Sequence, residues 1–360
     1  MYKEKKNILL VLFLFLQYGL IQWLSGKPHL IDTYYVKGIY PITSILQRSL
    51  FGWVGFSVGD VLYTALIIYL LWIIIKLIKP KDIRRSQLVS RLLWLLLCFY
   101  SFFYLFWGYN YFRSDLSGTL DLEKKDFQIE PSTQMSDRLI QRASQLQYEF
   151  VSHDSLPVYI DSDRRQLLHE AARGYEQLEK KHSQFTYDRP SVKTSLYSTA
   201  LTYMGFSGYF NPFTGEAQVD RLIPKTDFPM TCSHEIAHQL GIASESEANF
   251  IGFLAGIYHP DPVFNYSSTL TALRYVLLDI RRYDKELFDE HWKKIPKGIK
   301  INIKESDDFW RSYQNPMEPF FKLFYDSYLK HNQQKDGLKS YNRMVDLIIS
   351  YDQSFTLDIN

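Results

Sequence analysis

The chain has few cysteines and almost no net charge, and each shortage excludes a class of protein. Only Cys98 and Cys232 occur among 360 residues, and Cys98 lies in an apolar run that we place in a membrane. We therefore expect no disulfide between them, and disulfides do not hold this fold. The formal net charge is +2, so the totals give no sign of a nucleic-acid-binding protein. We expect no nucleic acid among its partners.

Charge is also missing from three long stretches. Residues 7–26, 61–75 and 92–112 contain no Asp, Glu, Lys or Arg. A helix that crosses the hydrocarbon core needs about 20 mostly apolar residues. The first and third stretches reach that length outright, and the second reaches it by including residues 56–59. The sequence predicts three transmembrane helices, at about 8–24, 57–78 and 92–112.

Two other interpretations compete with three membrane helices. The first stretch follows MYKEKK, which resembles the basic start of a cleaved signal peptide. The other two stretches could instead be buried core helices. No small-residue cleavage site follows the first stretch, two more apolar runs do, and uncharged runs of this length are rare in soluble cores. We therefore favour a membrane protein, with the lipid bilayer as one partner.

Basic residues predict its orientation. Three lysines precede the first stretch and six basic residues crowd 76–91, whereas the longer loop expected over 25–59 carries only three. By the positive-inside rule, the N-terminus and residues 76–91 are cytoplasmic. An odd number of spans then places everything after Arg113 on the other side of the inner (cytoplasmic) membrane.

The remaining residues are numerous enough for one domain with its own core. We divide the chain into a membrane anchor (1–112), a connector (113–131) and an extracytoplasmic domain (132–360). Short strands are expected at 192–197 and, as a pair around turn residues, within 205–220. Apolar spacing predicts helices at 132–152, 163–182, 265–284, 306–331 and 338–351, with 295–306 as a loop or short strand. The expected fold class is an α-helical anchor plus a mainly helical α+β domain with a small sheet.

One short motif carries chemistry. In HEIAH, residues 234–238, the two histidines stand four apart and project from the same face of a helix, so His234 and His238 can bind one zinc ion. Glu235 lies about 100° around that helix, where its carboxylate can reach a water on the ion. Zinc lowers the pKa of such a water, and Glu235 can accept its proton and pass it to a leaving amine. Gly241 is the expected end of the helix.

A catalytic zinc ion needs a third protein ligand and an open position. A second helix is expected after Ser244, and we assign Glu245 as the third ligand. Glu247 lies about 200° further around that helix and is the alternative. Asn249 shares the face of Glu245 and is expected to hold a ligand histidine by its free N–H. The acidic residues could also be a solvated first turn that complements the helix dipole.

The same residues resemble a known class of enzymes. E-x-x-x-(D/N) after H-E-x-x-H is the arrangement of gluzincin metallopeptidases, and HQLGIASESEANFIGFLA is similar to their E-x-E-A-N-x-F-A signature. The resemblance implies a zincin-like fold, zinc ligands His234, His238 and Glu245, and Glu235 as the base. Related families commonly have an aspartate where this chain has Asn249.

Nearly the whole chain also resembles a domain-of-unknown-function family of bacterial three-span membrane proteins. The match rests on FWGYNYFR, PFTGEA, HEIAHQLGIASESEANF and YDSYLKHNQQKDGLKSYNRMVDLI. It implies a zinc-peptidase-like domain outside the cytoplasm and brings no substrate.

Further residues are candidates for substrate contacts. In gluzincins an edge strand beside the zinc helix pairs with an extended substrate. The candidate strand is Glu216, Ala217, Gln218 and Val219, with a purely structural hairpin as the alternative. Candidate donors to the oxyanion, for each of which simple packing is the alternative, are Tyr203, Tyr209, His259 and Tyr266.

Together these features predict a membrane-anchored zinc metallopeptidase with one catalytic Zn²⁺, which hydrolyses peptide bonds of extracytoplasmic peptides or proteins. The alternative is a non-catalytic envelope protein with a structural zinc site or a partner-binding domain. Structural zinc has four protein ligands, so a fourth ligand from Cys232 or His259 would favour that alternative. We expect Cys232 to be a small buried residue instead.

Overall fold

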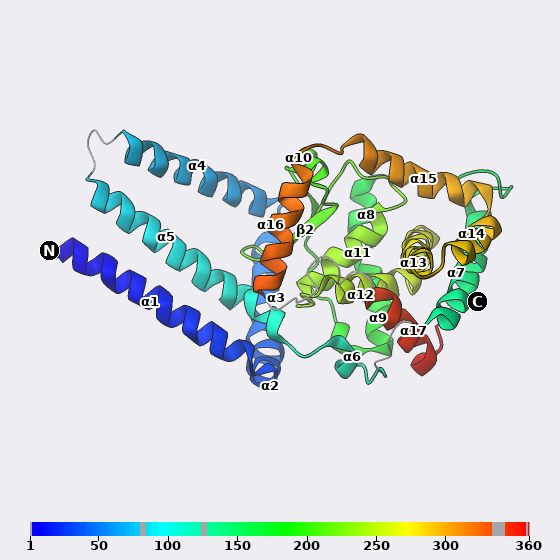
Figure 1. The fold of residues 1–360 in the computed structure, drawn as a ribbon, viewed down its shortest axis with the longest axis horizontal. Helices are drawn as coiled ribbons and strands as arrows, with labels where there is room; N and C mark the ends of the chain where they lie inside the picture. Colours follow the sequence, from blue (N-terminus) through cyan, green and yellow to red (C-terminus); the bar gives the residue numbers. More distant parts are fainter. Residues whose placement is uncertain (1, 80–83, 124–127, 333–342, 358, 360) are drawn as a thin grey trace.

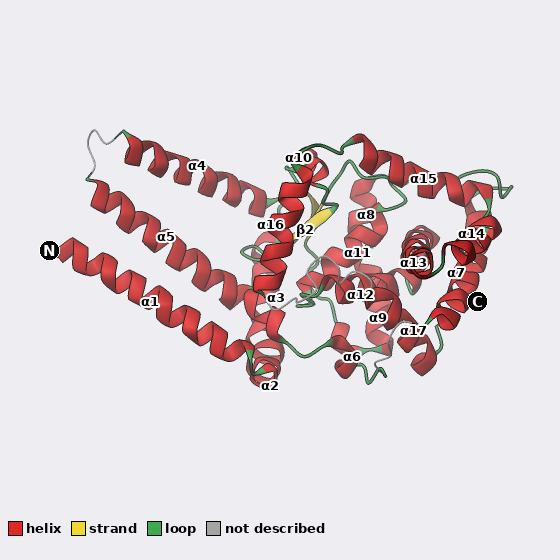
Figure 2. Ribbon diagram, in the orientation of Figure 1, coloured by secondary structure: helices red, strands yellow, loops and turns green. Residues whose placement is uncertain are grey.

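The computed structural model describes residues 2–79, 84–123, 128–332, 343–357 and 359. Three long helices project from one side of a mostly helical body (Figure 1). One small sheet lies inside that body, and nearly all other elements are helices (Figure 2). The chain is therefore predominantly α-helical with a small mixed sheet, as the sequence predicts.

The projecting helices are α1 (Tyr2–Ser25), α4 (Val58–Ile78) and α5 (Arg85–Phe106). Each is long and apolar enough to cross a membrane. Few of their residues are buried inside the protein, so their apolar surfaces face outward, as expected of helices in lipid. The end of α1, the start of α4 and the end of α5 all meet the helical body (Figure 1). The three-helix prediction is therefore supported, and α5 lies earlier in the chain than the predicted 92–112.

The last residues of that predicted span leave the helix. Residues Gly108–Phe112 form a 3₁₀ turn, η2, after the backbone departs from helical geometry at Trp107. Gly108 is required here, because a Cβ would stand 2.7 Å from the Tyr104 ring. The turn directs Trp107 and Tyr111 into a buried group of side chains that we call the junction cluster. It consists of Ile21, Ile31, Tyr35, Tyr40, Tyr104, Trp107, Tyr111, Phe112, Ala243 and Leu329.

The expected loop at 25–59 is mostly helical, which corrects the prediction. It contains α2 (Pro28–Leu30), a nine-residue π-helix η1 (Ile31–Ile39) and α3 (Tyr40–Phe51). Its aromatic and aliphatic side chains at Ile31, Tyr35 and Tyr40 are buried in the junction cluster. Tertiary packing therefore stabilises a helix that its mixed local sequence does not signal.

The body is built around two buried helices, α12 (Glu245–Ile257) and α13 (Pro262–Tyr283). Except at Glu247, α12 is buried along its whole length, as expected of a helix at the centre of a core. It packs on α11 (Phe228–Gln239), α13, α9 and α17. The other helices are α6 (Leu116–Thr119), α7 (Ile129–Phe150), α8 (Arg164–Glu170), α9 (Ala172–Lys181), η3 (Ser183–Phe185), α10 (Ser198–Met204), α14 (Lys285–Lys294), α15 (Lys297–Ser312), α16 (Glu318–His331) and α17 (Arg343–Phe355).

Several predicted helix bounds need correction. The helix expected at 163–182 is two helices, α8 and α9. The helix expected at 306–331 is interrupted between α15 and α16. Pro316 lies in this interruption and cannot continue an α-helix, whereas Pro319 lies in the first turn of α16, where proline is tolerated. The segment 295–306, expected as loop or strand, is largely inside α15, whose buried residues recur at helical spacing from Ile299 to Ser306. Residues 338–342 of the last predicted helix lie outside the described residues.

The sheet has the strand order β1-β3-β2, with β1 (Val192–Thr194), β2 (Gly208–Asn211) and β3 (Glu216–Val219). β3 pairs in parallel with β1 and antiparallel with β2. Glu216, Ala217, Gln218 and Val219 therefore form the central strand, with a neighbour on each side. The prediction that they form an edge strand open to a substrate is wrong, and β2 occupies the edge instead.

Glu216 has a different role, because it ties the sheet to a membrane-type helix. Its carboxylate pairs with Lys193 at 2.5 Å inside the protein. It also accepts hydrogen bonds from the backbone N–H groups of Val58 (3.1 Å) and Gly59 (2.6 Å). These two groups open α4 and have no partner inside that helix. These hydrogen bonds join a helix of the predicted anchor (1–112) to a strand of the predicted extracytoplasmic domain (132–360).

We expect Glu216→Gln to destabilise the protein strongly. Removing one partner of a buried ion pair leaves an uncompensated charge, here on Lys193, at a cost of about 3–5 kcal/mol. The measurement is the thermal unfolding midpoint of the detergent-purified full chain. Asp289→Asn, which removes an exposed ion pair with Lys285, is the control and should leave the midpoint unchanged. Equal midpoints for Glu216→Gln and the wild type would contradict this role of Glu216.

Candidate metal centre

The HEIAH motif lies in α11, and a tight turn brings α12 back against it. The turn depends on Gly241, whose φ of 81° is in the left-handed region. A Cβ at Gly241 would also stand 2.8 Å from the Tyr40 ring. Further along, a Cβ at Gly252 of α12 would stand 2.9 Å from the backbone nitrogen of His234. The two helices can approach closely only because these residues are glycines.

This hairpin brings three predicted residues together. His234 Nε2 lies 3.4 Å from Glu245 Oε2, and His238 Nε2 lies 3.7 Å from Glu245 Oε1. The three potential ligand atoms all lie within 4.8 Å of one another. Tetrahedral zinc ligands at 2.0–2.1 Å from the ion stand about 3.4 Å apart. The two imidazoles and the carboxylate therefore fit one divalent ion.

The alternative ligand, Glu247, points elsewhere. Its Oε1 accepts a hydrogen bond of 2.6 Å from the backbone N–H of Leu116. The suggested fourth ligands are also remote from the three-residue group. His259 Nε2 lies 2.9 Å from the carbonyl oxygen of Glu170, and Cys232 is buried but is not part of the group. Among the described residues, the candidate centre therefore offers three ligands.

Burial and mutual charge determine the protonation of these groups. Burial alone would raise the pKa of Glu245, but His238 and His234 outweigh it and lower the value to about 2. Burial lowers the pKa of His238 to about 4, so this imidazole is in the neutral, metal-binding form at pH 7. Burial also acts to lower the pKa of His234, but its hydrogen bond to Glu245 and the nearby carboxylates raise it above its usual value.

The outer nitrogens of the two histidines differ. The carbonyl oxygen of Ile242 lies 2.7 Å from His238 Nδ1, which would donate to it and leave Nε2 free to bind a metal. His234 Nδ1 is buried and has no hydrogen-bond partner. Asn249 is near enough to raise the pKa of His234, yet its amide donates to the Tyr275 hydroxyl at 3.4 Å. The structure therefore places Asn249 beside His234 without the predicted hydrogen bond to Nδ1.

Glu235 is buried directly beneath the edge strand. A Cβ at Gly208 of β2 would stand 2.6 Å from Glu235 Oε1, so no larger residue fits between strand and carboxylate. Glu235 Oε2 has no hydrogen-bond partner. Burial raises the pKa of Glu235 to about 8, with a further contribution from the charge of Glu245. Buried carboxylates with raised pKa values and an unused oxygen are typical of functional sites.

A family comparison covers most of the chain, including the whole centre. The model described as "Protein of unknown function (DUF3810)" matches residues 35–349. The chain belongs to the DUF3810 family. No curated protein and no solved structure matches it. Membership agrees with the resemblance to a domain-of-unknown-function family, while the family description carries no activity.

Two further side chains contact the candidate centre of this DUF3810 protein, and no motif in the sequence predicted either of them. The Tyr325 hydroxyl of α16 donates to Glu245 Oε1 at 2.6 Å. The Trp107 ring meets the His238 ring edge-on, with centroids 5.9 Å apart. Both residues come from distant segments, so no local spacing could connect them to HEIAH.

The four suggested oxyanion donors make other contacts. Tyr209 donates to Asp60, and Tyr266 donates to Asn302 at 2.8 Å. The ring of the exposed Tyr203 packs against Tyr313, and His259 lies against Glu170 as described above. Tyr325 therefore replaces them as the hydroxyl nearest to the ligands, among the described residues.

We expect Glu245→Gln and Glu247→Gln to differ sharply in zinc binding. Glu245→Gln removes a candidate ligand, so zinc affinity should fall by more than about 100-fold. That loss exceeds the one typical of changing a residue that only hydrogen-bonds to a ligand. Glu247→Gln is the matched control and should keep about one zinc per chain, because Glu247 does not face the histidines. Metal analysis of the purified full chain after dialysis measures both. Equal zinc content in the two variants would contradict the assignment of Glu245.

Proposed function

We propose that this protein is a membrane-anchored, zinc-dependent metallopeptidase that hydrolyses peptides or proteins outside the cytoplasm. The observation that carries the proposal is the grouping of His234, His238 and Glu245 within 4.8 Å, with Glu235 adjacent on the same helix. Three ligands and a neighbouring base are typical of catalytic zinc, whereas structural zinc has four protein ligands.

Each residue then has a defined role. His234, His238 and Glu245 hold the ion, which when bound would polarise a carbonyl group and lower the pKa of a water. Glu235 is the general base. Its raised pKa, about 8, suits a group that accepts a proton and then donates it near neutral pH. It transfers the proton from the attacking water to the leaving amine.

The edge strand β2 is the better candidate for holding an extended substrate. β3 occupies one side of β2, and no described strand pairs with its other side. Gly208 of β2 lies directly over the Glu235 carboxylate. A peptide that adds to this edge by main-chain hydrogen bonds would therefore pass close to the base. We therefore propose β2, in place of residues 216–219, as the strand that pairs with an extended substrate.

The orientation of the protein is part of the proposal. The N-terminal end of α1 and the ends of α4 and α5 near residues 79 and 84 lie away from the body (Figure 1). These ends carry the excess of basic residues that the positive-inside rule assigns to the cytoplasm. The centre would then lie outside the cytoplasm, next to the membrane.

We expect Glu235→Gln to keep zinc and lose hydrolysis. The amide preserves shape but cannot accept the proton, so the hydrolysis rate should fall by about 10²–10⁴-fold. The measurements are cleavage of a quenched peptide library by the purified full chain and zinc content of the same sample. Cellular support would come from envelope peptides that appear in the wild type and not in a Glu235→Gln strain.

The control and the contrary outcomes are distinct. Glu247→Gln should cleave like the wild type, because Glu247 lies outside the centre. A Glu235→Gln protein that holds zinc and cleaves at the wild-type rate would exclude Glu235 as the base. A wild type that holds zinc tightly and cleaves nothing would favour a structural zinc site.

We expect Gly208→Ala to reduce hydrolysis more than zinc binding. The added methyl group would press on Glu235 Oε1 and on the Gln218 carbonyl, each 2.6 Å from its position, whereas its three nearest atoms include none of the candidate ligands. Zinc content and cleavage rate are compared with those of Gly118→Ala, where a Cβ meets nothing within 4 Å. If Gly208→Ala and Gly118→Ala cleave equally fast, the close approach of β2 to the base has no role in the reaction.

A further inference from the structure

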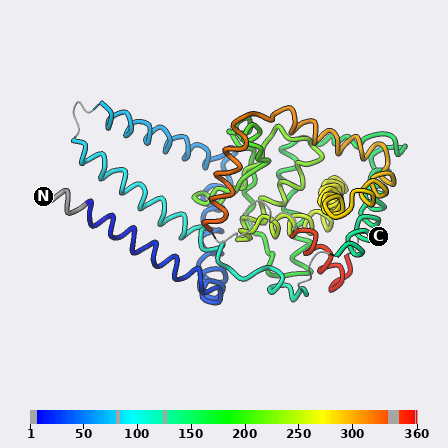
Figure 3. Tube along the Cα trace, viewed as in Figure 1, coloured from blue at the N-terminus to red at the C-terminus, as the bar shows by residue number. Residues whose placement is uncertain are grey.

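Helix α16 lies between the projecting helices and the body (Figure 1). In the view of Figure 1 and Figure 3 it runs crosswise to α4 and α5. Its side chains contact α5 and α1. The Tyr328 ring packs edge-on against Phe103 of α5, with centroids 6.3 Å apart. The His331 ring stacks on Tyr18 of α1, with centroids 6.5 Å apart.

One face of α16 is buried in the protein. Leu329 is fully buried in the junction cluster, and Tyr325 and Tyr328 pack beside it. From this face the Tyr325 hydroxyl reaches Glu245. The inner face therefore already has its partners, and it contacts the metal centre.

Next to this buried face, α16 carries an exposed apolar stripe, made of Met317, Phe320, Leu323 and Phe324. These side chains are 54%, 60%, 65% and 69% exposed. At 100° per residue they fall within one arc of about 120° on the helix. No described element covers them. Large apolar side chains gathered on one helix face mark an interaction surface rather than ordinary solvent exposure.

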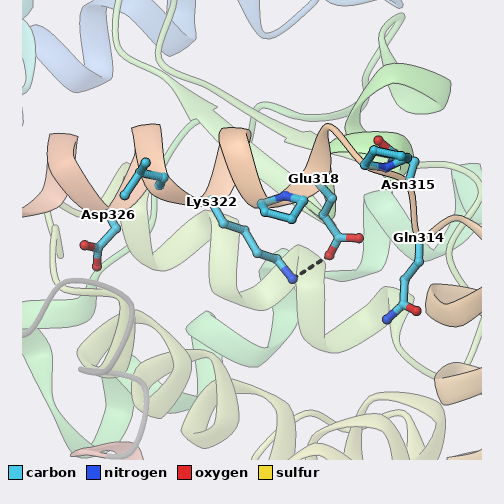
Figure 4. A pocket seen from close by; sticks show the side chains of 8 residues that line it. Gln314, Asn315, Glu318, Lys322 and Asp326 are labelled. Carbon is cyan, nitrogen blue, oxygen red and sulfur yellow. Dashed lines mark ion pairs between the residues drawn. The ribbon is translucent and has the colours of Figure 1, made fainter.

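Charged residues lie on the side of α16 away from the stripe, as in helices that lie in a membrane surface. Lys322 pairs with Glu318 at 2.5 Å, and Lys330 pairs with Asp326 at 2.6 Å. A shallow groove of about 820 Å³ runs along this charged side (Figure 4), lined by Gln314, Asn315, Glu318, Lys322, Leu323 and Asp326. The groove contains none of the metal-ligand candidates.

The position of His331 shows which way the stripe faces. On the helix, His331 lies in the same arc as Phe320 and Phe324. Its partner Tyr18 lies within Asn7–Ser25, the part of α1 that is apolar enough to cross a membrane. The stripe is therefore continuous with a surface that lies in lipid if α1 crosses the bilayer.

We propose that the Met317, Phe320, Leu323 and Phe324 stripe docks α16 onto the surface of the bilayer crossed by α1, α4 and α5. The helix lies in the plane of the membrane, with its apolar side chains in the headgroup and acyl boundary, about 5–10 Å deep. Its buried face holds Tyr325 at Glu245. Lipid contact thus fixes the position of the hydroxyl nearest to the metal ligands, and the centre lies at the membrane surface. This docking does not depend on the proposed peptidase activity.

The experiment measures lipid contact at single labelled positions. The full chain with Cys98→Ser retains only the buried Cys232, and without a further cysteine it should take up no thiol-reactive dye. Phe320→Cys and Phe324→Cys are made in this background, labelled with an environment-sensitive fluorophore and inserted into phosphatidylcholine nanodiscs. Nitroxide-bearing lipids quench dyes in lipid, and iodide quenches dyes in water.

Two further positions serve as controls. Leu16→Cys, on the exposed side of α1, reports lipid contact, and Tyr283→Cys, exposed at the end of α13, reports water. We expect nitroxide lipids to quench positions 320 and 324 at least about twofold, as at position 16, because a docked helix lies within the headgroup and acyl boundary. Iodide should quench only position 283.

Two results would overturn the proposal. Quenching of positions 320 and 324 by iodide and not by nitroxide lipids would show that the stripe faces water. Protection from both quenchers would show that protein covers it, as in contact with a second copy of the chain.

Discussion

The buried carboxylate of Glu245 is the constraint on which the rest of the centre depends. It lies between two imidazoles and accepts a hydrogen bond from Tyr325. A carboxylate stays ionised inside a protein only when positive charge or hydrogen-bond donors face it closely. Burial raises the pKa of Glu235, and the negative charge of Glu245 adds to that rise. The charges of the candidate ligands and of the candidate base therefore affect one another. This effect depends on the distance between α11, which carries His234, Glu235 and His238, and α12, which carries Glu245.

That separation is held partly by residues next to the membrane-type helices. The Tyr40 hydroxyl donates to the carbonyl oxygens of His238 (3.2 Å) and Gln239 (3.0 Å), and Arg113 donates to that of Gly241 (3.0 Å). Carbonyls at the end of a helix have no partner within it, so these side chains act as a C-terminal cap of α11. From the other side, the Gln239 side chain donates to Gly215 and Ser191 beside the sheet. The helix that carries both histidines is thus fixed between the sheet and the ends of the spans.

Local patterns explain what could be predicted from the sequence and what could not. Uninterrupted apolar runs predicted three long helices, because span length is a local property. The spacing of His234, His238 and Glu245 predicted their approach, because two short helices joined by a tight turn leave few arrangements. Sheet order is not local, so PFTGEAQVD indicated strands but not that residues 216–219 would be central. Tyr325 and Trp107 reach the centre through long-range packing, for which the sequence has no periodic signal.

The aromatic residues explain why the anchor and the body are hard to separate. Tyr and Trp combine an apolar ring with a polar group, so they suit the region between lipid and a polar domain. In the junction cluster the rings of Tyr40 and Trp107 pack together, while the Tyr104 hydroxyl donates to Asn332 at 3.1 Å. The family match begins at residue 35, inside η1, and therefore includes α4 and α5 together with the centre. The contacts within this matched region join two of the three long helices to the candidate metal ligands. The helices are then part of the scaffold that positions the centre, and a division of the chain at residue 112 cuts through that scaffold.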